Sequence, residues 1–172
     1  LNRDCTEKKR IVILIDGDRS LEKAVKDIAK EKGITNRIDA YVLDFIHLLE
    51  YVWKVANAYM GESHKGRVAW VKRYATLLLN SKHKKVLQEW KNIIKYAKLS
   101  KNGLHNVERG ITYLSNHLHM VDYKSYLKKG YPITTGAVES ACGHFVKARM
   151  ERGAMHWGKQ GAQNILDIRA VK

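Results

Sequence analysis

Cysteine, proline and long apolar runs are scarce in this sequence of 172 residues. Its two cysteines, Cys5 and Cys142, lie far apart, and neither belongs to a CxxC pair, which argues against a disulfide framework or a zinc finger. The longest unbroken apolar run is IVILI at 11–15, far short of the ~20 residues that a membrane helix needs. No signal peptide is recognisable near Leu1. We therefore expect a cytoplasmic protein that does not contact a membrane.

Acidic residues are also few. There are 17 Asp and Glu against 32 Lys and Arg, which gives a formal net charge of +15 and a pI near 9.8. A folded chain this basic associates with the phosphates of DNA through counterion release, even without sequence specificity. DNA is therefore the expected partner.

The first third of the chain has the pattern of a βαβ unit. IVILI at 11–15 is typical of a buried strand, and the residues from Leu21 repeat at helical spacing up to a cap at Gly33. A second run, RIDAYVLDFI at 37–46, is again typical of a strand. Two strands joined by one helix predict a parallel pair in an α/β sheet.

Beyond Asp44 the apolar period becomes helical. A long helix is expected up to Gly61, and further helices over 65–79, 83–99 and 104–128. We therefore predict a mostly helical α/β protein with three parts: residues 1–60 with the strands, an all-helical insertion at 61–129, and C-terminal helices at 130–172. Seven lysines between 82 and 101 form either a solvated face or a flank that faces DNA, and the sequence favours neither.

Three acids stand where they could meet. Asp16 ends the first strand, Asp44 ends the second, and Glu139 lies at the start of a helix that is expected from about 136 to 152. Carboxylates at the carboxyl edge of a parallel sheet lie where α/β folds bind ligands. Such a cluster, in a basic protein, suits two Mg²⁺ (or Mn²⁺) ions that act in phosphoryl transfer. We name these three acids as catalytic candidates, with Asp16 and Glu139 as metal ligands.

Each acid also has a simpler explanation. Asp16 precedes Gly17 in a common turn pair, and Asp44 is well placed to cap the helix that starts at Phe45. Glu139 is a first-turn acid that would complement the dipole of its helix.

The helix that carries Glu139 is expected to contact DNA. Gly143, one turn further on, leaves space beside the carboxylate. The predicted DNA-binding residues are Lys147, Arg149, Arg152, His144 and Trp157. The bases would equally complement the dipole at the end of their own helix, and packing is the default role of Trp157 and His144.

Four segments resemble the ISKra family of bacterial insertion-sequence transposases. They are LIDGDRSLEK at 14–23, VLDFIHLLEYVWK at 42–54, YPITTGAVESACGHFVKARMERGAMHW at 131–157 and GAQNILDIRA at 161–170. The resemblance implies an RNase H-like core with a DDE triad, in which Asp16 corresponds to the second acid and Glu139 to the third. It also implies DNA transposition, self-association on paired DNA ends and a prokaryotic, nucleoid-associated location.

The chain departs from the family pattern at several positions. Gly143 stands where the family usually has arginine, Ala148 where it has aspartate, and His156 within a Gly-Met-Arg-Trp block. The first acid of the family lies on an upstream strand, and Asp4 has no strand around it. We therefore expect the C-terminal part of a transposase, in which strand cleavage is negligible. The alternatives are a truncated regulatory protein that binds DNA, and a structure-specific nuclease that uses Asp18 or Asp44.

Overall fold

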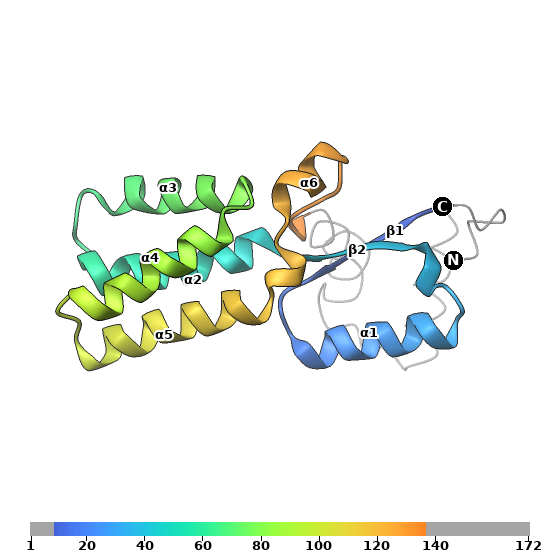
Figure 1. Cartoon of the computed structure of the whole chain (residues 1–172), viewed down its shortest axis with the longest axis horizontal. Coiled ribbons are helices and arrows are strands. Elements are labelled where there is room, and N and C mark those ends of the chain that lie inside the picture. Colours follow the sequence, from blue (N-terminus) through green and yellow to red (C-terminus); the bar gives the residue numbers. More distant parts are fainter. Residues whose placement is uncertain (1–8, 137–172) are drawn as a thin grey trace, which may run out of the picture. The chain divides into compact units, whose positions relative to one another are not determined.

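The computed structural model describes residues 9–136, which are mostly helical and contain one two-stranded parallel sheet (Figure 1). Strand β1 (Ile11–Ile15) leads to helix α1 (Arg19–Glu31), and a 3-10 turn, η1 (Thr35–Arg37), leads to strand β2 (Ile38–Leu43). The predicted α/β class, with helices predominating, is confirmed, and so is the parallel pair of strands.

Local side-chain chemistry explains why α1 lies between the strands. The Asp18 carboxylate accepts hydrogen bonds from the backbone N–H groups of Ser20 and Leu21, so it satisfies donors that the first turn leaves unpaired. Helix α1 ends before Gly33, whose φ of +64° suits glycine, as the sequence predicts. Leu21 and Ile28 are 46% and 54% exposed, so the apolar stripe of α1 is only partly covered.

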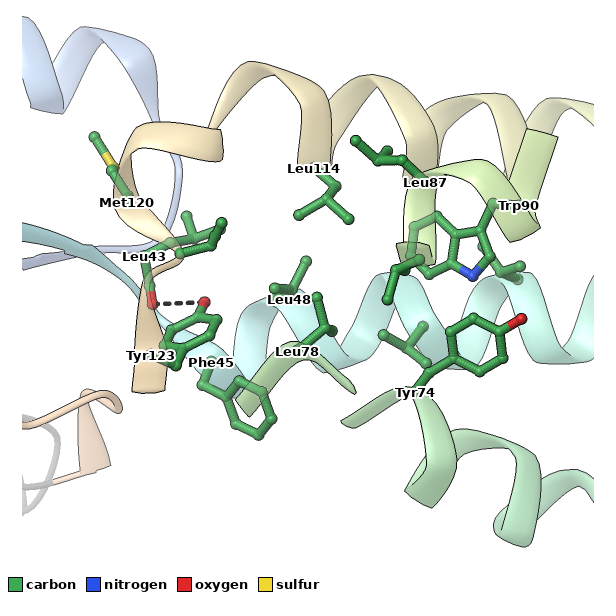
Figure 2. Close-up of a cluster of buried hydrophobic side chains, with 14 of the residues drawn as sticks. Leu43, Phe45, Leu48, Tyr74, Leu78, Leu87, Trp90, Leu114, Met120 and Tyr123 are labelled. Carbon is green, nitrogen blue, oxygen red and sulfur yellow. Dashed lines mark hydrogen bonds between the residues drawn. The ribbon is translucent and has the colours of Figure 1, made fainter. Parts of the chain in front are cut away.

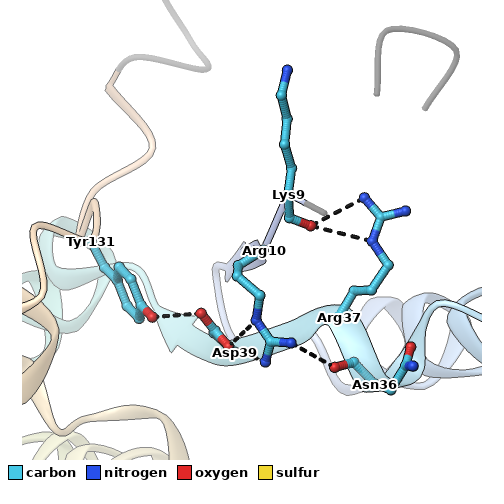
Figure 3. Close-up of polar contacts among 6 residues, drawn as sticks. All are labelled: Lys9, Arg10, Asn36, Arg37, Asp39 and Tyr131. Carbon is cyan, nitrogen blue, oxygen red and sulfur yellow. Dashed lines mark hydrogen bonds and ion pairs between the residues drawn. The ribbon is translucent and has the colours of Figure 1, made fainter. Parts of the chain in front are cut away.

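The two strands are fixed at their starting end by polar contacts (Figure 3). The Arg10 guanidinium pairs with the Asp39 carboxylate and donates to the Asn36 carbonyl at 2.9 Å. The Tyr131 hydroxyl donates to the other oxygen of Asp39 at 2.7 Å. Asp39 sits at an irregularity in the ladder, because Ile11 pairs with Ile38 whereas Val12 pairs with Ala40. Asp39, the extra residue at this irregularity, thereby faces Arg10, which precedes β1.

Helices make up the remainder of the described chain. They are α2 (Phe45–Met60), α3 (Arg67–Leu79), α4 (His83–Tyr96), α5 (Lys101–Asn116) and α6 (Tyr123–Lys128), with a second 3-10 turn, η2 (Leu118–Met120), before α6. Helix α5 packs along α2, and α3 and α4 complete the bundle (Figure 1).

The prediction of one helix over 104–128 is wrong, because the chain breaks after Asn116 into η2 and α6. Tertiary contacts override the helical periodicity at this point. The Ser81 hydroxyl donates to the Asp122 carboxylate at 2.6 Å and accepts from the Lys124 N–H at 3.1 Å, which fixes the start of α6. The Tyr123 hydroxyl donates to the Leu43 carbonyl at 3.0 Å (Figure 2), so α6 is drawn toward the end of β2.

One apolar core joins the end of the sheet to the helices (Figure 2). Leu48 and Leu114 face each other from α2 and α5, and Trp90 of α4 is fully buried beside them. Gly110 allows this close approach. A Cβ atom at Gly110 would stand 2.9 Å from a methyl carbon of Val55 and 3.2 Å from the indole of Trp90.

We expect Gly110→Val to lower the free energy of unfolding by about 1–3 kcal/mol, because the added methyl groups overpack the junction of α2, α4 and α5. Urea denaturation followed by circular dichroism measures the change. Thr112→Val is the matched control, since it places the same side chain on the exposed side of α5 and should change stability by less than about 0.5 kcal/mol. Equal stability of the two variants would contradict the packing described here.

Candidate functional site

Two aspartates lie at one edge of the sheet because the strands are parallel and end in register. Ile15 pairs with Leu43, so Asp16 and Asp44 each follow directly after a paired residue. The backbone N–H of Asp44 donates to the Ile15 carbonyl at 2.8 Å, which extends the ladder to the last residue before the helix. Both residues therefore lie at the carboxyl edge of the sheet, as the sequence predicts.

Asp44 acts as the N-cap of α2. Its carboxylate Oδ1 accepts from the N–H groups of Ile46 at 2.7 Å and His47 at 3.2 Å, and the residue is 3% exposed. The capping interpretation is confirmed. Capping directs the carboxylate toward the backbone of α2, so Asp44 lies at the sheet edge but is buried from solvent.

Asp16, by contrast, is exposed at the same edge. Its Oδ1 accepts from the Asp18 N–H at 3.0 Å and closes a tight turn through Gly17, which has φ of +93°. The turn expected for this pair is thus present. The Asp16 carboxylate remains at the surface, whereas Asp44 is buried.

A tyrosine from the helical bundle holds this turn. The Tyr113 hydroxyl on α5 donates to the Asp16 carbonyl at 2.6 Å. Burial, followed by the neighbouring Tyr51 phenol and the Asp16 and Asp44 carboxylates, raises the pKa of Tyr113, so its phenol stays protonated and remains a donor. The backbone of Asp16 is therefore positioned by a residue from far along the chain.

Aromatic rings support Tyr113 in turn. Its ring stacks on Tyr51 with centroids 4.0 Å apart and an angle of 10° between the planes. His47 meets both rings edge-on at about 6 Å, and its Nδ1 lies 3.7 Å from the Glu50 carboxylate. His47 contributes its backbone N–H to the cap of α2, while its imidazole joins the aromatic cluster.

An open groove of about 480 Å³ runs beside the Asp16 turn along α5. Gly17, Tyr51 and Tyr113 line it together with Arg19 and Arg109, two exposed arginines. The guanidinium group binds phosphate oxygens in a bidentate manner. The groove therefore offers two guanidinium groups next to the turn that carries Asp16, and the Glu108 carboxylate also belongs to its lining.

The remaining predicted site residues lie outside the described residues: Glu139, His144, Lys147, Arg149, Arg152 and Trp157. Within residues 9–136, no group of three His, Cys, Asp or Glu side chains is arranged to hold a metal ion. Asp16 directly follows β1 and is exposed there, whereas the Asp44 carboxylate caps α2. No helix in this same range is long and apolar enough to cross a bilayer.

Sequence reasoning did not single out Tyr113 or Tyr51. Tyr51 lies in the VLDFIHLLEYVWK segment at 42–54, whereas Tyr113 belongs to no recognisable motif, and the pairing of Tyr113 with Asp16 depends on where α5 lies. A usable signal was the spacing of Gly103 and Gly110, seven residues apart and both buried, which indicates close packing of α5. That packing brings the Tyr113 ring to Gly17.

Asp44→Ala should lower the free energy of unfolding by about 0.5–2 kcal/mol, because two N–H groups at the start of α2 lose their acceptor. Asp44→Asn keeps an amide oxygen that caps nearly as well, so it should cost less. Chemical denaturation of both variants measures the difference. A loss for Asn as large as that for Ala would show that the charge of Asp44, rather than its capping, matters.

Gly17→Ala should destabilise the protein by more than about 1 kcal/mol, because the left-handed backbone is strained for alanine and its Cβ would lie 2.5 Å from the Tyr113 hydroxyl oxygen. A double-mutant cycle with Tyr113→Ala separates the two causes. Gly17→Ala should cost less stability in the Tyr113→Ala background, because the ring that its Cβ would meet is gone. An equal cost in both backgrounds would mean that Tyr113 does not contact this turn.

No family model, curated protein or solved structure matches this chain. The resemblance to ISKra transposases therefore depends on the four sequence segments alone. The chemistry of the site depends on the exposed Asp16 carboxylate, the turn that holds it and the groove at its side.

Proposed function

We propose that this chain is the C-terminal part of a DDE transposase with an RNase H-like catalytic core, and that it binds DNA. The observation that carries the proposal is the exposed carboxylate of Asp16, which directly follows the parallel strand β1 and lies beside a groove lined by Arg19 and Arg109. The net charge of +15 supports DNA as the partner.

In the complete enzyme, we propose Asp16 and Glu139 as ligands of Mg²⁺ or Mn²⁺. The bound ions would supply charge stabilisation at the scissile phosphodiester. Asp16 would hold its carboxylate in place through the turn at Gly17 and the hydrogen bond from Tyr113. Arg19 and Arg109 would bind backbone phosphates in the groove, and the predicted DNA-binding residues of 144–157 would add contacts.

We propose Asp16 and Glu139 as the second and third acids of the triad, and we assign no residue of this sequence as the first. The chain is therefore proposed to bind DNA and to cleave it negligibly. Self-association with transposase subunits and a place at the prokaryotic nucleoid belong to the same proposal.

A regulatory protein that binds DNA without catalysis is the second candidate. It is favoured by one observation, namely the net charge of +15, because attraction to DNA phosphates needs no metal site. A nuclease that completes its cluster with Asp44 or Asp18 is less favoured. Asp44 is buried as a helix cap, and the Asp18 carboxylate accepts three hydrogen bonds at the start of α1.

We expect Mn²⁺ to bind weakly to the chain, and Asp16→Asn and Glu139→Gln each to weaken that binding at least tenfold, because each removes an anionic ligand. Electron paramagnetic resonance of free Mn²⁺ measures the affinity. Asp27→Asn is the matched control, since Asp27 is an exposed acid on α1, away from the strand edge, and its loss should leave the affinity unchanged.

The same variants separate the two candidate functions. If Asp16→Asn binds Mn²⁺ as the wild type does, the transposase site has no support and the regulatory alternative stands. Incubation with supercoiled plasmid and Mn²⁺ tests completeness. Nicking that disappears in Glu139→Gln would show that the chain holds all the catalytic acids it needs.

A further inference from the structure

A second groove, of about 670 Å³, lies at the other end of α2, between α3 and α4. Its aromatic members are Tyr59, Trp70, Tyr74 and Tyr96. We call it the aromatic groove. Tyr96 is 74% exposed and Tyr59 is 47% exposed, so ring surface is offered to solvent at the rim. The volume lies within the range of pockets that bind small molecules.

The aromatic groove is rigidly supported from the core. Trp70 lies 6.4 Å from Tyr59 and 3.9 Å from Tyr74, and Tyr74 lies 6.2 Å from the fully buried Trp90, all between ring centroids. This line of rings runs from the surface into the bundle. A planar group that enters the groove therefore meets rings already held in position, so little ordering entropy opposes its stacking.

Glu89, the acid in the lining of the groove, is paired with two polar neighbours. Glu89 accepts from Arg73 at 2.8 Å and from the Tyr74 hydroxyl at 2.6 Å. Burial opposes ionisation of Glu89, but these two hydrogen bonds outweigh it and keep the pKa of the carboxyl below its usual value. The carboxylate is thus held by its neighbours, and Asn92 adds an exposed amide to the lining.

Positive charge borders the groove. The Lys95 ammonium lies 5.0 Å from the centre of the Tyr96 ring, and the Arg73 guanidinium lies at the same distance from Tyr74. Helix α4 and its flanks carry the lysines for which the sequence favoured neither solvent nor DNA, and all of them are exposed: Lys82, Lys84, Lys85, Lys91, Lys95, Lys98 and Lys101. Stacking rings beside cations are the combination that binds unpaired nucleotides.

We infer that the aromatic groove binds unpaired bases of a single nucleic acid strand, with Tyr96, Tyr59 and Trp70 stacking on the bases and the lysines of α4 holding the phosphates. The ligand class follows from charge complementarity, because an apolar protein segment would satisfy the rings but would bring no negative charge to Lys95 and the other exposed lysines of α4. This site is distinct from the Asp16 edge and needs no metal ion.

The test uses the full chain in EDTA, with a fluorescein-labelled ten-nucleotide oligo-dT followed by anisotropy. Tyr96→Ala should weaken binding about tenfold, as expected for the loss of one stacked ring, whereas Tyr96→Phe should retain it. Tyr59→Ala removes a second ring of the groove, this one on α2, and should also weaken binding. Leu127→Ala, a comparably exposed apolar residue on α6, is the control and should have no effect.

The outcomes are separable from those of the proposed function, because EDTA removes the metal ions that the proposed site at Asp16 needs, whereas stacking in the aromatic groove needs none. Unaltered affinity in both Tyr96→Ala and Tyr59→Ala would overturn the inference. The inference also fails if duplex DNA of equal length competes as well as the single strand, since paired bases cannot stack in the groove. A change in oligomeric state without a change in oligo-dT affinity would identify the groove as a contact between copies of the chain.

Discussion

The parallel pairing of β1 with β2 is the constraint on which the candidate site depends. The register brings Ile15 opposite Leu43, and the Asp44 N–H continues the ladder to the Ile15 carbonyl. A one-residue slip would turn the side chains of the slipped strand to the opposite face of the sheet. The contacts of Arg10 with Asp39 and Asn36 at the far end of the strands fix the same register from the other side. Asp16 and Asp44 share an edge because both ends of the sheet are held.

Asp16 and Asp44 have different roles at this edge because their surroundings differ. Asp44 is enclosed by the start of α2 and satisfies its N–H groups, so it stabilises the connection between sheet and bundle. Asp16 directly follows β1 and is itself followed by Gly17, whose left-handed backbone turns the chain away before a helix can enclose the carboxylate. Tyr113 then fixes the turn from α5. The helical bundle thereby contributes to the geometry of a carboxylate that lies outside it.

Much of the fold could be predicted from local patterns. IVILI before Asp16-Gly17, the cap at Gly33 and the change of apolar period at Asp44 predicted β1, α1, β2 and the start of α2, because each depends on residues near in sequence. The helix predicted over 104–128 was wrong, because its break depends on Ser81 and on the Leu43 carbonyl, which are distant in the chain. For the same reason Asp16 could be named as a candidate from sequence, whereas Tyr113, which holds it, could not.

Helix α2 connects the two surfaces on which DNA binding is proposed. It begins at the Asp44 cap beside Asp16, and it ends at Tyr59 and Met60, which line the aromatic groove. Sixteen residues at 1.5 Å each give the helix a length of about 24 Å. That length corresponds to about seven base-pair steps of duplex DNA at 3.4 Å per step. A DNA segment with a phosphate at Asp16 and unpaired bases in the aromatic groove would therefore need to open within about one helical turn of the proposed metal site. The rigidity of α2, buried along one face against α5, is what would give that separation a fixed value.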